Sequence, residues 1–226
     1  MKDLTFLKKG IFAYKGIYDN KNVYENTLEA FKVAIKRRNN IYLEVLETKD
    51  HVLVVCNNDV FERLHNSKDR VEDMTYEELN FVSFYHIPSL VEVLDLIDGK
   101  VSILLEPRVH TRHHILFDLL DNYKGKFAII SVSPRIINWF NKNRPNYIVG
   151  EVITKRKGFN LGFYFNKTDF KSYNINYFDK IKVKSLKEVG DIVLGYLINS
   201  DDKYDTYRDV FDNLIVDNFI NLKNLK

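Results

Sequence analysis

The 226-residue sequence has little cysteine and little excess charge. Its one cysteine, Cys56, cannot form an intramolecular disulfide, which excludes a disulfide-stapled scaffold and favours a reducing compartment. The 34 basic and 31 acidic side chains leave a net charge of +3, and the longest basic run is the triplet Lys36, Arg37 and Arg38. Proteins that bind nucleic acid normally carry a dense basic stripe, so the charge predicts no nucleic-acid partner.

Long apolar runs are also missing. The longest, such as Val52–Cys56, are far shorter than the roughly 20 residues that a transmembrane helix needs. The first ten residues carry Lys2, Asp3, Lys8 and Lys9 and have no continuous apolar stretch of the kind found in signal peptides. We therefore expect no transmembrane segment, no targeting peptide and a cytoplasmic location.

Short apolar runs rich in valine and isoleucine recur along the chain. With 16 Phe, 14 Tyr and one Trp, they can bury enough apolar surface to exclude a disordered chain. Most do not alternate with polar residues, which is typical of parallel strands buried on both faces. The predicted strands are Ile11–Tyr14, Ile41–Glu47, Val52–Cys56, Val101–Leu105, Phe127–Ser131, Tyr147–Ile153, Ile192–Ile198 and Asn213–Val216.

Helix-start signals lie between these strands. Asn26, Thr75 and Ser89 are each followed three residues later by glutamate, as in a capping box, and Ser133 precedes a proline. Such alternation predicts one α/β domain, either a (β/α)8 barrel or a doubly wound sheet. No glycine-rich phosphate loop follows any strand, which removes the usual sign of a nucleotide-binding sheet. The polar, aromatic segment 155–184 predicts a barrel-wall helix with a loop, or an aromatic rim for lipid or partner contact.

Four motifs follow one another near the N-terminus. Ala13–Gly16 reads A-Y-K-G, Glu25–Phe31 reads E-N-T-L-E-A-F, Glu44–Leu46 reads E-V-L, and Thr48–Asp50 reads T-K-D. They resemble the opening motifs of the glycerophosphodiester phosphodiesterase family, A-H-R-G, P-E-N-T-L-x-A-F, E-x-D and T-K-D-G. Further segments resemble the family in the same order, namely Leu53–Val55, Val71–Leu79, Ile87–Leu94, Glu106–Arg108, Ile130–Val132 and Gly195–Asn199. The resemblance covers nearly the whole chain and implies one TIM-type (β/α)8 barrel over residues 1–226.

The sequence departs from the family where the family carries its acid and base. The two catalytic histidines of the family correspond to Tyr14 and Asn57, and the arginine beside the first histidine corresponds to Lys15. A tyrosine with an ordinary pKa near ~10 is a poor proton acceptor at neutral pH, and an asparagine does not titrate. Since loss of one acid or base typically costs ~10²–10⁴ in rate, we expect hydrolysis to be lost or strongly impaired.

The metal-binding positions have also changed. Of the three carboxylates that bind metal in the family, Glu44 and Glu106 are retained, but the third position is Leu46, which offers no oxygen ligand. The lysine after the last glutamate corresponds to Arg108. We expect Lys15 and Arg108 to supply the positive charge beside the two glutamates, and we expect no cofactor.

Three hypotheses about function stay open. The first is a catalytically inactive barrel that binds a phosphate or glycerophosphate-type ligand through Lys15, Glu44, Glu106 and Arg108. The second is an active phosphodiesterase with Mg²⁺ or Ca²⁺ held by Glu44 and Glu106, with His110 as a replacement acid or base. The third is a structural or regulatory partner without a ligand. The sequence does not determine the oligomeric state.

Overall fold

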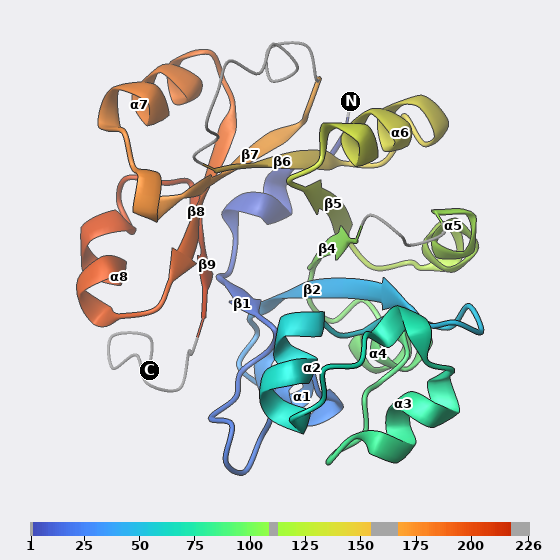
Figure 1. Ribbon diagram of the computed structural model, residues 1–226. Coiled ribbons are helices and arrows are strands. Elements are labelled where there is room, and N and C mark those ends of the chain that lie inside the picture. Colours follow the sequence, from blue (N-terminus) through green and yellow to red (C-terminus); the bar gives the residue numbers. More distant parts are fainter. Residues whose placement is uncertain (1, 109–112, 155–166, 218–226) are drawn as a thin grey trace.

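The chain folds into a closed parallel barrel with helices outside it (Figure 1). The computed structural model describes residues 2–108, 113–154 and 167–217. Eight parallel strands form the barrel: β1 (Phe12–Tyr14), β2 (Asn40–Glu47), β4 (Ile103–Pro107), β5 (Phe127–Ser131), β6 (Val149–Ile153), β7 (Phe170–Asn174), β8 (Ile192–Ile198) and β9 (Asn213–Val216). The barrel closes because β1 pairs with both β2 and β9. The predicted (β/α)8 barrel is confirmed.

Helices separate the strands and cover the outside of the barrel. They are α1 (Leu28–Lys36), α2 (Asn58–His65), α3 (Tyr76–Val82), α4 (Leu90–Ile97), α5 (His113–Asn122), α6 (Pro134–Asn143), α7 (Lys180–Glu188) and α8 (Asp201–Tyr207). Short 3-10 helices lie at Thr5–Lys8 (η1), Val71–Asp73 (η2) and Ile175–Tyr177 (η4). None of the helices in the described ranges combines the length and the apolar character needed to cross a bilayer.

Alternate side chains of the strands fill two separate apolar regions, as the period of a strand requires. One region lies between the barrel and its helices and contains Phe31, Leu43, Leu105 and Phe140. The other lies inside the barrel and contains Phe12, Tyr42, Leu104, Ile130, Phe170, Leu194 and Ile215. Polar side chains therefore collect beyond this interior core, at the carboxyl ends of the strands, which we call the mouth.

The predicted strand Val52–Cys56 is not a barrel strand. It forms β3 (Leu53–Val55), which runs antiparallel to β2 in a hairpin outside the barrel. From β3 the chain continues into α2, η2 and α3, and apolar side chains of this excursion pack on Leu46, including Val54, Phe61 and Leu79. The direction of β3 depends on its tertiary partner β2, and a short apolar run carries no signal for that direction.

One barrel strand was not predicted from the sequence, namely β7, which lies within the segment 155–184. The sequence predicted a helix with a loop, or an aromatic rim, for this segment; the described part contains β7, η4 and the start of α7, whereas residues 155–166 lie outside the described residues. The strand was missed because its sequence, Phe-Lys-Ser-Tyr-Asn, is too polar to read as a buried strand. Its small side chain Ser172 is fully buried between neighbouring strands.

Two of the predicted helix starts are capping boxes. At Thr75 and Ser89 the side chain accepts a hydrogen bond from the backbone N–H of the glutamate three residues on, and that glutamate bonds back. Ser133 caps α6 ahead of its proline without a side-chain hydrogen bond. At α1 the cap is Thr27, one residue after the predicted Asn26. Asn26 instead adopts a left-handed conformation, with φ of 59°.

Candidate functional site

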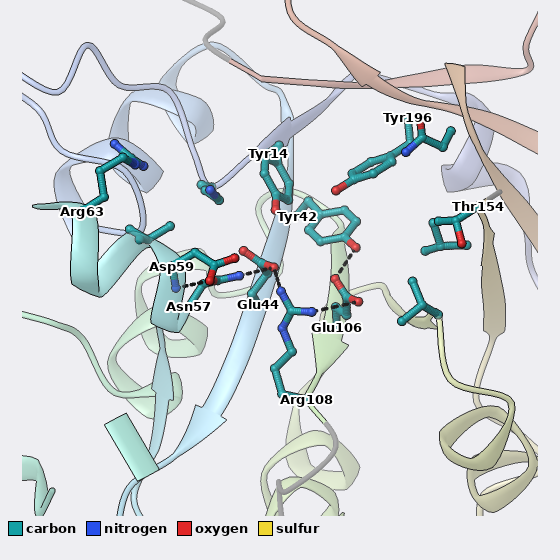
Figure 2. A pocket seen from close by; sticks show the side chains of 15 residues that line it. Tyr14, Tyr42, Glu44, Asn57, Asp59, Arg63, Glu106, Arg108, Thr154 and Tyr196 are labelled. Carbon is teal, nitrogen blue, oxygen red and sulfur yellow. Dashed lines mark hydrogen bonds and ion pairs between the residues drawn. The ribbon is translucent and has the colours of Figure 1, made fainter. Parts of the chain in front are cut away.

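A cavity of about 380 Å³ opens at the mouth of the barrel. Parallel barrels bring the carboxyl ends of all strands to one face, where ligands bind in this architecture. The charged side chains that line the cavity are Lys15, Glu44, Asp59, Arg63, Glu106 and Arg108. Neutral lining residues include Tyr14, Tyr42, Asn57, Thr154 and Tyr196 (Figure 2). Of the predicted site residues that the structure describes, all except Leu46 line this one cavity.

Arg108 lies between the two retained glutamates. The strand register sets Glu44 of β2 beside Glu106 of β4, and the backbone N–H of Arg108 donates to the carbonyl of Val45, 3.0 Å away. The Arg108 guanidinium forms an ion pair with Glu44 Oε1, and its Nη1 is 3.6 Å from Glu106 Oε1 (Figure 2). Glu44 and Glu106 are almost completely buried. A fixed guanidinium thus occupies the space between these carboxylates.

The ionisation of this trio reflects burial and mutual attraction. Burial alone would lower the pKa of Arg108, but the carboxylates of Glu44 and Glu106 raise it above its ordinary value. Burial raises the pKa of Glu106, with Glu44 adding to the effect and Arg108 opposing it. One guanidinium is therefore shared by two carboxyl groups, and the ionisation of Glu106 is disfavoured.

Three tyrosines form the inner wall of the cavity. The ring of Tyr14 makes edge-on contacts with Tyr42 and Tyr196, with centroids 5.1 and 5.9 Å apart, and Tyr42 Oη donates to Glu106 Oε2 at 2.7 Å. Burial raises the pKa of Tyr14 far above its ordinary value, and the Glu44 carboxylate adds to this. Burial likewise raises the pKa of Tyr196 to about 12. These hydroxyl groups stay protonated at neutral pH and cannot accept a proton there.

Asn57 reaches the mouth because the β2–β3 hairpin turns the chain back. The backbone N–H of Cys56 donates to the carbonyl of Glu44, and the Asn57 amide then donates from Nδ2 to Glu44 Oε1 at 2.7 Å. Its Oδ1 accepts the backbone N–H of Asp59 at 2.8 Å and so caps α2. Asn57 therefore holds the carboxylate and starts a helix. As a neutral amide it transfers no proton.

Lys15 does not pair with Glu44 or Glu106, so that prediction is wrong. Its Nζ donates to Glu25 Oε2 at 2.8 Å and lies 4.7 Å from the centre of the Tyr14 ring. Lys15 sits in a left-handed turn with φ of 63°, which directs its side chain toward the β1–α1 loop that carries Glu25. Arg108 alone supplies the cation beside the two retained glutamates among the residues that the structure describes.

Arg63 is a mouth residue that the sequence reasoning missed. It comes from α2, and its Nη2 donates to Glu25 Oε1 at 2.5 Å. Lys15 binds the other oxygen of the same carboxylate, Oε2. Glu25 itself is 1% exposed and also accepts from Asn20 Nδ2 at 2.8 Å. The signal that could have found Arg63 is its position on α2, the helix whose N-cap, Asn57, lies at the mouth.

The donor set does not fit the divalent cation that the family resemblance implies. Leu46 is buried in the apolar cluster under α2 and α3, away from the cavity. Arg108 fills the space between Glu44 and Glu106, and no cluster of three acidic, histidine or cysteine side chains suited to a metal occurs within the described ranges. Glu44 Oε2 is buried and lacks a hydrogen-bond partner in the same part of the chain, so one acceptor remains unused.

Two further residues bear on proton transfer or nucleophilic attack, His110 and Cys56. His110, the suggested replacement acid or base, lies outside the described residues. Cys56 is buried, and burial raises the pKa of its thiol to about 12. A thiol that stays protonated is a core side chain rather than a nucleophile.

Comparison with known proteins identifies the family. Residues 19–219 match the model of the glycerophosphoryl diester phosphodiesterase family. The Bacillus subtilis protein YhdW, whose name places it among these phosphodiesterases, is 32% identical over 114 residues. That match covers 46% of this chain and 47% of YhdW, so the aligned part spans about half of each protein.

Solved structures share the fold. A glycerophosphodiester phosphodiesterase from Thermotoga maritima superposes with a TM-score of 0.78 at 20% identity, over 92% of this chain and 94% of that one. An Oleispira antarctica phosphodiesterase, solved in complex with its product sn-glycerol-3-phosphate, has a TM-score of 0.78 at 14% identity, over 93% of each chain. Because the family model covers most of the sequence and the barrel agrees with it, this chain belongs to the glycerophosphoryl diester phosphodiesterase family.

Proposed function

We propose that this protein is a non-hydrolytic member of its family that binds a small glycerophosphate-type ligand at the barrel mouth without a divalent cation. The observation that supports this most directly is the guanidinium of Arg108 between Glu44 and Glu106. A divalent cation would both neutralise a phosphoryl group and activate a bound water, whereas a guanidinium carries positive charge but cannot bind and activate water as a Lewis acid. The ligand class follows from the family and from the sn-glycerol-3-phosphate in the Oleispira structure.

The proton-transfer groups support the same proposal. Cleavage of a phosphodiester needs a base for the attacking hydroxyl and an acid for the leaving alkoxide. Tyr14 and Asn57 stand at the family's histidine positions, and the pKa of Tyr14 is raised rather than lowered. Neither side chain can therefore accept a proton as a general base at neutral pH. The polar cavity remains, and it is large enough for a small phosphorylated molecule.

The test is a hydrolysis assay combined with a binding assay. Purified protein is incubated with glycerophosphocholine or glycerophosphoethanolamine and Mg²⁺, Ca²⁺ or Mn²⁺, and released glycerol 3-phosphate is measured. We expect no turnover with any cation, and a rise in melting temperature with glycerol 3-phosphate in the presence of a chelator. Turnover that disappears in a Glu44→Ala variant would overturn the proposal in favour of an active enzyme. We further propose a cytoplasmic location, since the chain has a single cysteine, Cys56, and no disulfide scaffold.

A further inference from the structure

We propose that the anionic group of the ligand binds between Lys15 and Arg63, and that Arg108 is not the anion-binding residue. This inference rests on the proposed function, because it places the phosphate of the ligand within the same cavity. In Figure 2, Arg63 lies on one side of the cavity, apart from the group of Glu44, Glu106 and Arg108. We call the part formed by Glu44, Glu106 and Arg108 the Arg108 end, and the part formed by Lys15 and Arg63, with Glu25 behind them, the Arg63 end.

The single positive charge at the Arg108 end is already paired with carboxyl groups. One guanidinium faces two carboxyl groups there, and Glu44 has a buried oxygen without a partner among the residues that the structure describes. A phosphate approaching Arg108 would meet two acidic side chains at close range, around a guanidinium that they already contact. Like charges repel strongly under those conditions. The charge at this end therefore opposes an anion.

The Arg63 end has two cationic side chains for one shared carboxylate. Lys15 Nζ and Arg63 Nη2 share one carboxylate, Glu25, at 2.8 and 2.5 Å. Glu25 is 1% exposed and is not among the cavity-lining residues, whereas both cations line the cavity. The two cations of this trio thus face the space where a ligand would lie, and the Glu25 carboxylate lies behind them.

Both cations also keep hydrogen-bond capacity for a ligand. Lysine has three N–H donors and arginine five, and Glu25 takes one from each side chain. The guanidinium can bind phosphate with two parallel hydrogen bonds, a geometry that favours arginine at phosphate sites. The Arg63 side chain is 53% exposed and the Lys15 side chain 12%, so Arg63 has room to move toward a ligand.

Of the described acidic side chains that line the cavity, only Asp59 belongs to neither trio. Figure 2 places it next to Asn57 and Glu44, between the two ends. Its negative charge weakens the binding of an anion at the Arg63 end. Neutralising it should therefore strengthen binding, which gives the experiment a gain as well as a loss.

The experiment measures dissociation constants of the full chain for inorganic phosphate and glycerol 3-phosphate by isothermal titration calorimetry. Arg63→Gln should weaken both by about tenfold, because a charge-assisted hydrogen bond is lost. Arg63→Lys, which keeps the charge, should recover part of the loss. Asp59→Asn should tighten both severalfold. The matched control is Arg70→Gln, since Arg70 is 59% exposed and ion-paired with Glu72, but lies away from the cavity.

Two results would overturn the inference. One is phosphate affinity that is unchanged in Arg63→Gln but falls in Arg108→Gln, which would return the anion to the Arg108 end and leave the proposed function standing. The other is an equal loss in Arg63→Gln and Arg70→Gln, which would show a non-specific effect of surface charge. Hydrolysis of a glycerophosphodiester would end the proposed function, yet these variants would still report where the anion binds.

Discussion

Arg108 and Glu44 are 64 residues apart in the sequence and form the ion pair at the centre of the mouth. The pairing of β2 with β4 produces this contact, because Glu44 is in register with Glu106 and Arg108 follows directly after β4. The same register that would let two carboxylates share a metal ion here lets them share a guanidinium. The mouth is therefore charge-compensated by the chain itself.

Removing Arg108 should create a cation site. In Arg108→Ala, the adjacent carboxylates of Glu44 and Glu106 lose their guanidinium, and carboxylate oxygens are good ligands for Mn²⁺ and Mg²⁺. We expect Mn²⁺ to bind to Arg108→Ala and not to the natural protein, as measured by electron paramagnetic resonance. Adding Glu44→Gln to the variant should abolish that binding. Equal Mn²⁺ binding by the natural protein would show that Arg108 does not exclude the metal.

Restoring the missing metal ligand should damage the fold. Leu46 is 3% exposed and packs against Val54, Cys56 and Phe61. Leu46→Asp would bury a carboxylate among apolar side chains and should lower the free energy of unfolding by about 3 kcal/mol or more. The matched Leu46→Met should cost less than about 1.5 kcal/mol. Urea denaturation measures both, and comparable losses would argue that position 46 tolerates charge.

His65 should make stability depend on pH. Its ring is 5% exposed, its Nδ1 accepts the backbone N–H of Phe84 at 2.9 Å, and burial lowers its pKa to about 4. Between that value and the ordinary 6.5, the unfolded chain binds more protons than the folded one, so stability falls as the pH falls. From pH 7 to pH 5 the histidine should remove about 2 kcal/mol from the free energy of unfolding.

The control for this pH dependence is a pair of variants. His65→Asn keeps an acceptor for Phe84 and should remove the histidine's share of the slope between pH 7 and pH 5. His86→Asn, which changes a half-exposed histidine beside Glu92, should leave most of it. Chemical denaturation at each pH gives the slopes. A slope that survives in His65→Asn would assign the dependence to other groups.

The two serine caps should differ in how much they contribute to the free energy of unfolding. Ser89 accepts the backbone N–H of Glu92 in a complete capping box at the start of α4, whereas Ser133 makes no side-chain cap hydrogen bond at the start of α6. Ser89→Ala should therefore lower the free energy of unfolding by about 1 kcal/mol, and Ser133→Ala by much less. Thermal denaturation of the two variants provides the comparison. Equal losses would mean that the Ser89 contribution is not due to its cap.

The sequence by itself determined the barrel class and placed most of the mouth. Unalternating Val/Ile runs between helix-start signals predicted a parallel α/β domain, and the family resemblance of the motifs selected the barrel. Residues at the ends of those runs, such as Tyr14 and Glu106, line the cavity. This works because strands and helix caps are local patterns. In a parallel barrel, the strand ends then converge on one face whatever the details of packing.

Only the tertiary structure decided which groups pair. Lys15 contacts Glu25 instead of Glu44, and Arg63 joins the mouth from a helix that follows an antiparallel hairpin. The polar strand β7 likewise gains its place from neighbours on both sides. Ion pairs and strand directions depend on distances between segments far apart in the chain. Those distances are set by the packing of the whole barrel, and no local run of residues encodes them.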